Sequence, residues 1–364
     1  MGGVLTGSFF ADLKRKMVNL NNHNKARKLI SLLIITSMCL AGAFCVTGCK
    51  KEEPASEPET KQEEDNNIYG DDTLGIDARV DEQLKDYRHI LLLGIDNGGR
   101  SDLMIVLSIN KKTNEIKSVP VHRDAYMQIS PDGTYDVDGV DYEFYKCNRA
   151  YKRDGIYGAM MELNRHMDLN IRECIAIDWD GVARFIDSMG GLDADITEDM
   201  LSTLNNSLGE KDKIDSAGMH RLNGRQAVQY LRVRKYDGGS APVREERNQE
   251  VLAQLFERAK TMDIEKLTKI YDDVASDLDT NMSRNTLTDT LASISESTLE
   301  STPSWPYEYT EMWDDAFYYF VPDTLDTNVQ ELHKTLFGQE NYETTETVKM
   351  LNEKIETLRK EQLH

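Results

Sequence analysis

Residues 89–124, HILLLGIDNGGRSDLMIVLSINKKTNEIKSVPVHRD, decide the fold. They contain three apolar runs, His89–Ile95, Leu103–Ile109 and Ile116–Val121, each of a length that suits one buried strand. A turn at 111–114 (KKTN) separates the second run from the third, which predicts a β-hairpin. Segments with helical spacing follow and alternate with short strands, so the pattern predicts one domain of the α/β class.

The later elements are predicted from apolar spacing alone. Helices are expected over 155–167, 181–188, 245–260 and 327–337, and strands over 175–177, 228–233 and 317–321. Strand alternation over 228–233 would place Tyr230, Arg232 and Arg234 on one face of a sheet. The tail 344–362 has a narrow apolar stripe, which predicts a helix that packs either on the domain or on a partner.

Charge is distributed unevenly along the chain. Lys plus Arg number 43 and Asp plus Glu number 64, which gives a net charge of −21. Residues 1–51 carry +7, so the remainder carries −28. Sequence-independent binding of nucleic acid needs a basic face, and this balance therefore excludes it.

The N-terminal segment has the features of an export signal. Residues 29–48 are twenty residues without a charge, preceded by three basic residues. The following Val46–Cys49 (VTGC) resembles a bacterial lipoprotein signal, in which the cysteine is lipidated and anchors the mature protein. An uncleaved membrane helix is the alternative, because the apolar run is long enough to span a bilayer. The expected location is the extracytoplasmic face of the cell membrane.

These observations predict four regions along the chain. They are an export signal (1–48), a lipidated Cys49 with a flexible acidic tether (49–80), a catalytic domain (81–340) and a C-terminal amphipathic helix (341–364). Beyond Cys49 only Cys147 and Cys174 remain, and their spacing does not suit zinc. They form either a disulfide or two buried thiols.

Four polar clusters follow apolar elements, and the first contains two carboxylates. Asp96 and Asp102 flank a glycine turn, with Arg100 between them. Two carboxylates brought together by one turn suit Mg²⁺ or Mn²⁺, since Mg²⁺ takes one or two carboxylates plus substrate oxygens. The alternative is that Asp96 serves the turn and that Arg100 and Asp102 form a surface pair.

The other clusters are rich in arginine. They are Arg123-Asp124 after the third strand, Arg232 with Arg234, and Arg244, Arg247 and Asn248 at i, i+3 and i+4 of a helix start. Each alone is compatible with a solvated surface. Together, six arginines and three aspartates give a local charge of +3 inside an acidic domain. Arginine suits bidentate phosphate contacts, so the clusters predict a pyrophosphate site that shares a divalent cation.

Seven motifs in register resemble those of the LytR-CpsA-Psr family. They are LLGID…RSD (92–102), RD (123–124), KCNRAY (146–151), GGLD (190–193), LNGRQA (222–227), RVR (232–234) and REERNQ (244–249). The resemblance covers about residues 88–260. It departs from the family at His122, where proline is usual, at Cys147, where an aliphatic residue is usual, and at Asn248, where glutamine is usual.

The resemblance implies a fold and an activity. The fold is a three-layer α/β/α sandwich around one mixed central sheet, with an apolar tunnel for a polyprenyl chain. The activity is transfer of a glycopolymer, such as teichoic acid or capsule, from undecaprenyl pyrophosphate to peptidoglycan through a phosphodiester. The family's metal ligands match Asp96 and Asp102, and its phosphate-holding residues match Arg100, Arg123, Arg232, Arg234, Arg244, Arg247 and Asn248. Arg123, Asp96 and Asp102 are the expected catalytic residues, with either carboxylate as the base.

Two other classes of function remain open from the sequence. One is an envelope lipoprotein that binds polyprenyl phosphates without turnover. The other is a transcriptional regulator, which the −28 charge of an exported domain argues against.

Overall fold

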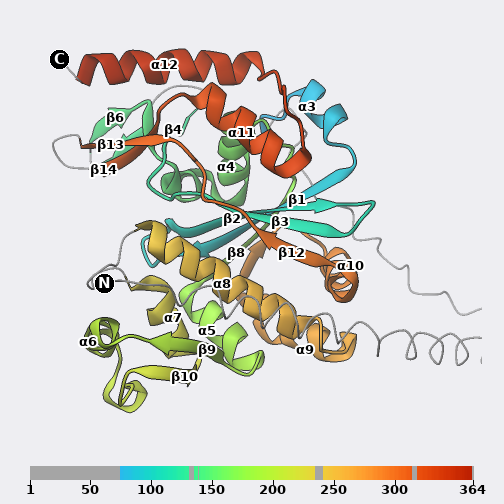
Figure 1. The fold of residues 1–364 in the computed structure, drawn as a ribbon, viewed down its shortest axis with the longest axis vertical. Coiled ribbons are helices and arrows are strands. Elements are labelled where there is room, and N and C mark those ends of the chain that lie inside the picture. The colour runs from blue at the N-terminus through green and yellow to red at the C-terminus, as the bar shows by residue number, and fades with distance from the viewer. Residues whose placement is uncertain (1–73, 131–134, 138, 234–240, 314–317, 363–364) are drawn as a thin grey trace, which may run out of the picture. The chain divides into compact units, whose positions relative to one another are not determined.

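A six-stranded mixed sheet forms the centre of the computed structural model, which describes residues 74–130, 135–137, 139–233, 241–313 and 318–362 (Figure 1). Its strand order is β11 (Leu278–Thr280), β8 (Glu173–Asp178), β1 (Tyr87–Ile95), β2 (Ser101–Asn110), β3 (Glu115–Pro120) and β12 (Thr298–Ser301). β1, β2 and β3 pair antiparallel in chain order, whereas β8 joins β1 and β12 joins β3 in parallel. The three apolar runs and the predicted hairpin are therefore confirmed.

Helices cover both faces of this sheet, which confirms the predicted three-layer architecture (Figure 1). The layer above it contains α3 (Ala78–Gln83), α4 (Ala150–Met167), α11 (Leu325–Phe337) and α12 (Glu346–Gln362). The layer below it contains α5 (Trp179–Ser188), α6 (Glu198–Ser207), α7 (Gly224–Arg232), α8 (Ala241–Ala259), α9 (Ile264–Val274) and α10 (Arg284–Ser293).

Small two-stranded sheets and short 3₁₀ helices complete the domain. The sheets pair β4 (Tyr126–Gln128) with β7 (Phe144–Lys146), β5 (Tyr135–Val137) with β6 (Val140–Tyr142), β9 (Leu192–Ile196) with β10 (Gly218–Leu222), and β13 (Tyr309–Trp313) with β14 (Tyr318–Pro322). The 3₁₀ helices are Cys147–Arg149, Glu210–Asp212, Ala275–Asp277 and Ile294–Glu296.

The two faces of the sheet are packed differently. On the upper face, Leu91, Leu93 and Val106 are at most 1% exposed beneath α4 and α11. On the lower face, Leu92 and Leu107 are only partly buried, although they lie in the middle of their strands. The lower face therefore keeps apolar surface that the helices below do not fully cover.

The strand predicted over 228–233 is wrong, because this segment is the second half of helix α7. The helix begins with a capping box, in which the Asn223 side chain accepts from the Gln226 amide (3.0 Å) and the Gln226 side chain accepts from the Asn223 amide (2.9 Å). A short apolar run fits a strand or a helix equally well, and the capping box decides for the helix.

This correction changes the position of the two arginines. Arg232 is the last residue of α7 rather than part of a sheet face, and Val233 ends the helix. Arg234 lies outside the described residues, as does Cys49 with the whole predicted export signal. Among the described helices, none is long and apolar enough to cross a bilayer.

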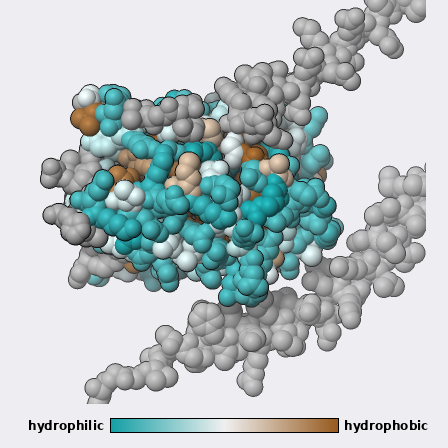
Figure 2. All heavy atoms as spheres, turned by 90° about the horizontal axis from the view of Figure 1, so that it is seen from above, coloured by the Kyte–Doolittle hydropathy of each residue, from teal (hydrophilic) through white to brown (hydrophobic). Residues whose placement is uncertain are grey.

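Both ends of the described chain pack on the domain. Leu74 and Val80 are at most 1% exposed, so residues 74–80 of the predicted tether are part of the folded domain. At the other end, α12 packs on α4 and α11 through Val348 and Leu351, which confirms the predicted helix and assigns its stripe to the domain. Seen from above α12, the surface is mainly hydrophilic with scattered hydrophobic residues (Figure 2).

The two cysteines of the domain, Cys147 and Cys174, are free and fully buried. Burial raises the pKa of both thiols well above the ordinary value. The thiolate is the reactive form of cysteine, so both side chains serve as small core residues.

Helix α4 buries a carboxyl group, Glu162, whose two oxygens have no hydrogen-bond partner within the described residues. Burial raises its pKa to about 8, against the opposing effect of Arg165 and Arg153. The neighbouring His166 is neutral, since burial lowers its pKa to about 3. Between the ordinary Glu value and about pH 8, the folded protein therefore keeps a proton that the unfolded chain releases.

Stability should accordingly fall as the pH rises through this window, and Glu162→Gln should remove that fall. We expect the variant to exceed the wild type in free energy of unfolding by on the order of a few kcal/mol above pH 8. The advantage should shrink towards pH 4.5, the ordinary Glu value. Urea unfolding at several pH values measures it, with the exposed Glu353→Gln as control. A difference that does not vary with pH would contradict the assignment.

Candidate active site

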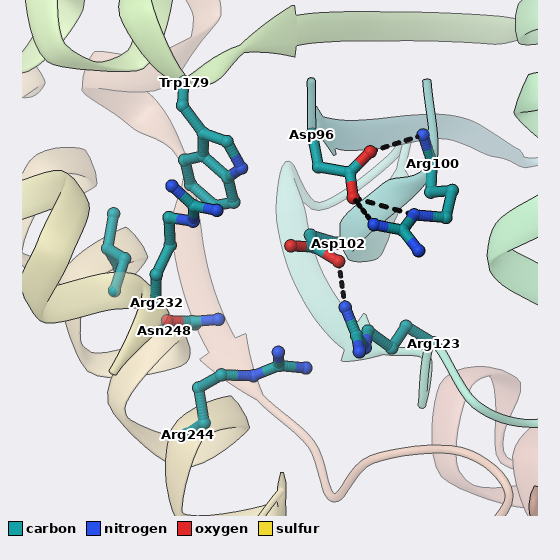
Figure 3. Close-up of a pocket in the computed structure, with 9 residues that line it drawn as sticks. Asp96, Arg100, Asp102, Arg123, Trp179, Arg232, Arg244 and Asn248 are labelled. Atoms are coloured by element: carbon teal, nitrogen blue, oxygen red, sulfur yellow. Dashed lines mark hydrogen bonds and ion pairs between the residues drawn. The ribbon is translucent and has the colours of Figure 1, made fainter. Parts of the chain in front are cut away.

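A cavity of about 250 Å³ lies where β1 and β3 end and β2 begins, beside helices α5, α7 and α8. Its lining consists of Asp96, Arg100, Asp102, Arg123, Trp179, Leu231, Arg232, Arg244 and Asn248. Figure 3 shows the cavity between two walls, with the aspartates, Arg100 and Arg123 on the sheet side. All four predicted polar clusters therefore contribute to one cavity. The first contributes all three of its residues, the α8 cluster contributes two, and the other clusters contribute Arg123 and Arg232.

The turn between β1 and β2 is built around the carboxylate of Asp96. Its Oδ1 accepts from the amides of Gly98 (2.9 Å) and Arg100 (2.8 Å), and its Oδ2 accepts from Arg100 Nε (2.8 Å) and Nη2 (2.6 Å). Gly99 has φ +73°, which a glycine adopts without strain. Burial alone would raise the pKa of Asp96, but these hydrogen bonds outweigh it and hold the pKa below the ordinary value.

The second carboxylate, Asp102, pairs with a different arginine. Its Oδ1 accepts a hydrogen bond from Arg123 Nη1, and its other oxygen points into the cavity (Figure 3). Asp124 orients Arg123, because its Oδ2 accepts from Arg123 Nε (3.4 Å). Lys146 Nζ in turn donates to Asp124 Oδ1 (2.8 Å). The sequence allowed a surface pair of Arg100 with Asp102, whereas in the structure Arg100 pairs with Asp96.

The opposite wall consists of an aromatic ring and a stacked arginine. Trp179 begins α5 directly after β8, and the Arg232 guanidinium lies 5.4 Å from the centre of its ring. Such a stack holds a cation over an aromatic face and leaves its N–H groups available to a ligand. Figure 3 shows both side chains facing Asp96 and Asp102 across the cavity.

Helix α8 contributes the most deeply buried cation of the cavity. Arg244 is 4% exposed and its Nη2 lies 3.7 Å from Glu245 Oε1, whereas its Nε has no acceptor among the described residues. Burial and then the nearby Arg123 lower the pKa of Arg244. The Asn248 amide lies 3.3 Å from the carbonyl oxygens of Leu231 and Arg244, which places its nitrogen towards them and its oxygen towards the cavity.

Among the predicted phosphate residues that the structure describes, Arg247 does not line the cavity. Arg247 donates from Nη2 to the carbonyl oxygen of Val233 (2.6 Å) and lies over the ring of Tyr230 at 5.1 Å. It thereby ties α8 to the C-terminal end of α7, which carries Arg232. Arg247 is a positioning residue, although its spacing on the helix suggested a direct contact with an anion.

Sequence reasoning missed two lining residues, Trp179 and Leu231. Trp179 had a usable signal, since it follows a strand that is parallel to β1, and ligands bind at the carboxyl ends of such strands. Sequence reasoning also missed the partner of His122, whose Nδ1 lies 2.6 Å from the buried carboxylate of Glu245. This pair joins the end of β3 to α8 beside Arg244.

The charges of the cavity favour an anion. Four arginines face two aspartates, a net of +2 in a chain whose net charge is −21. Asp96 already accepts four hydrogen bonds, so its negative charge is largely compensated within the turn. A phosphate or pyrophosphate group would supply the acceptor that the Nε of Arg244 lacks among the described residues.

Comparison with known proteins identifies the family that the sequence motifs resemble, and the match covers most of the chain. Residues 46–336 match the LytR_cpsA_psr family. Biofilm regulatory protein A of Streptococcus mutans is 29% identical over 203 residues, 53% of this chain and 49% of that protein. The polyisoprenyl-teichoic acid–peptidoglycan teichoic acid transferase TagV of Bacillus subtilis is 28% identical over 270 residues, 68% of this chain and 63% of that protein.

A solved structure has the same fold. The crystal structure of Bacillus subtilis TagV superposes with a TM-score of 0.57 and 26% identity, covering 71% of this chain and 99% of that one. The chain spans about half to two thirds of the length of the two curated relatives given above. The family match, together with the cavity that the family motifs line, shows that the chain belongs to the LytR-CpsA-Psr family.

Proposed function

We propose that this protein is an extracytoplasmic phosphotransferase. It would attach a glycopolymer carried on undecaprenyl pyrophosphate to peptidoglycan through a phosphodiester. The observation that carries the proposal is Arg244, a buried cation that lines a cavity with three other arginines and lacks an acceptor for its Nε within the described chain. Burying a charge is unfavourable unless partners compensate it. Glu245 lies 3.7 Å from Arg244 but also contacts His122 at 2.6 Å, and a pyrophosphate would be a further partner of matching charge.

The chemistry follows from where charge develops. A peptidoglycan hydroxyl attacks the polymer-side phosphorus, the bond from this phosphorus to the bridging oxygen breaks, and undecaprenyl phosphate leaves. Negative charge grows on the bridging and non-bridging oxygens in the transition state. Arg123 and Arg244 would stabilise it from one end of the cavity, and Arg100 and Arg232 from the other.

The polyprenyl chain needs an apolar path away from the phosphates. The lower face of the sheet supports such a path, because Leu103, Leu107, Ile109 and Ile175 are only partly buried there. Leu103 follows Asp102 directly, so this apolar face begins at the cavity. We propose that the lipid lies along it, between the sheet and the lower helices.

Mg²⁺ or Mn²⁺ fits the carboxylates only with help from the substrate. No group of three or more His, Cys, Asp or Glu side chains in the described ranges is arranged to hold a metal. Mg²⁺ is commonly held by one or two carboxylates plus phosphate oxygens and water. Asp102 would supply the protein's share, and Asp96 would join it only by exchanging a donor such as Arg100 for the ion. The ion would neutralise charge on the phosphates.

Asp102 is better suited than Asp96 to accept the proton of the attacking hydroxyl. Both oxygens of Asp96 accept hydrogen bonds from the turn, and its pKa is lowered, which makes it a weak base. Asp102 has an oxygen directed into the cavity (Figure 3). A base must be within hydrogen-bond reach of the proton it takes, which Asp102 satisfies for a hydroxyl in the cavity.

We also propose that Cys49 is the lipidated residue that holds the domain at the extracytoplasmic face of the cell membrane. Cys49→Ser should block lipid attachment and signal removal, and leave a larger precursor. Intact-mass measurement of the protein extracted from membranes tests this. A mature wild-type protein without lipid on Cys49 would instead assign the anchor to a membrane helix.

Transfer by the purified protein tests the proposed activity. Protein, lipid-linked glycopolymer and peptidoglycan sacculi are incubated with Mg²⁺, and polymer covalently bound to the sacculi is measured. We expect polymer linkage and release of undecaprenyl phosphate. Tight binding of the lipid-linked polymer without either product would support the non-catalytic lipid-binding alternative.

A further inference from the structure

The indole of Trp179 carries a buried hydrogen-bond donor without a partner among the described residues. Trp179 is 7% exposed, and its Nε1 has no acceptor within the described chain. The residue lines the cavity, and Figure 3 shows the nitrogen edge of the ring directed towards it. Buried donors are normally satisfied, so an orphan donor at a cavity wall indicates an acceptor that arrives with a ligand.

The ring is held in place from several sides. Asp178, directly before it, caps α5 by accepting from the Gly181 amide at 2.7 Å, which fixes the backbone at Trp179. One face of the ring stacks on Arg232. The ring also lies close to Gly94 of β1, where a Cβ would be 3.4 Å from Trp179 Cη2. The N–H direction is therefore set before any ligand binds, which lowers the entropic cost of using it.

The surroundings select the kind of acceptor. Arg100 and Arg232 line the same cavity from opposite walls (Figure 3), whereas the Asp96 carboxylate already accepts from Arg100 and two backbone amides. An anion with several oxygens can engage the arginines and the indole at once. A neutral N–H adds direction to that contact without adding charge.

We propose that Trp179 Nε1 donates a hydrogen bond to a non-bridging oxygen of the bound pyrophosphate, at the end of the cavity opposite Arg123 and Arg244. This inference rests on the proposed function, since it takes the pyrophosphate of the lipid carrier as the ligand. It makes Trp179 a substrate-binding residue rather than only a wall of the cavity.

Calorimetric binding of inorganic pyrophosphate to the full chain tests the contact. Trp179→Phe keeps an aromatic ring beside Arg232 but removes the N–H, and should weaken binding about 10- to 100-fold. Trp305→Phe is the matched control, because the Trp305 Nε1 is also buried without a partner in the described chain but does not line the cavity. Trp305→Phe should bind pyrophosphate as the wild type does.

The wild-type protein itself supplies a second measurement. In ¹⁵N-labelled protein the indole signal missing from Trp179→Phe identifies Trp179, and pyrophosphate should move its N–H proton downfield. Equal affinities of wild type and Trp179→Phe, or an indole signal that does not move at saturation, would overturn the proposal. A wild type that binds no pyrophosphate would instead overturn the proposed site as a whole, so the two failures are distinguishable.

Discussion

Arg244→Met is expected to lower the rate of transfer about 10²–10³-fold, the usual effect of removing one preorganised donor from a developing oxyanion. The same variant should unfold at the same or a higher temperature than the wild type when no ligand is present. Arg244 is 4% exposed and its pKa is lowered by burial, so its charge is unfavourable in the empty cavity. An apolar side chain of similar length removes that unfavourable charge.

Steady-state transfer and a thermal melt of each protein measure both effects. Arg284→Ala is the control, because Arg284 is an exposed arginine that pairs with Asp272 at the surface. It should change neither quantity appreciably. Full activity of Arg244→Met would remove this arginine from the reaction. A large loss of stability would show that Glu245, 3.7 Å away, compensates the buried charge, and would contradict the expectation that this charge is unfavourable without a ligand.

The second large effect concerns the metal. Wild-type activity should disappear in chelator and return with Mg²⁺, and Asp102→Asn should lower it by about two orders of magnitude at any Mg²⁺ concentration. Asp96→Ala should lose activity for a different reason, because it removes the acceptor that holds Arg100 and two amides of the turn. It should therefore also lower the melting temperature.

Titration of Mg²⁺ against these proteins separates the two roles. Asp195→Asn, an exposed carboxylate of β9, serves as the control and should behave as the wild type. Mg²⁺ should bind the protein more tightly when pyrophosphate is present, because the substrate supplies ligands that the chain lacks. Equal activity of the wild type in chelator and in Mg²⁺ would end the metal assignment of Asp96 and Asp102.

The sequence was sufficient where local pattern and tertiary structure agree. The strands of residues 89–121 were predictable because continuous apolar runs, separated by a polar turn, are compatible with only one arrangement, a β-hairpin of buried strands. The segment 228–233 was not, since six residues fit both periodicities. There the deciding signal was the Asn223–Gln226 capping box, which lies upstream of the apolar run.

The site residues, too, were predictable only where the local sequence pattern agrees with the tertiary structure. Charge clusters identified Asp96, Arg100, Asp102, Arg123 and Arg244 as neighbours, and the cavity contains all five. Helix spacing could not predict that Arg247 donates to the Val233 carbonyl, because Val233 caps the end of a different helix, α7. Trp179 was missed because an aromatic residue at a strand end is usually part of the core. Only the structure reveals that its N–H has no acceptor in the part of the chain described.

The fate of the polymer-side phosphorus tests the central claim most directly. The lipid-linked polymer is labelled with ³²P at this phosphorus and incubated with the protein, Mg²⁺ and peptidoglycan. The label should appear in the peptidoglycan-bound polymer, with one unlabelled undecaprenyl phosphate released for each linkage. Label that stays with the lipid, or is released as inorganic phosphate, would contradict a phosphotransferase that joins polymer to peptidoglycan.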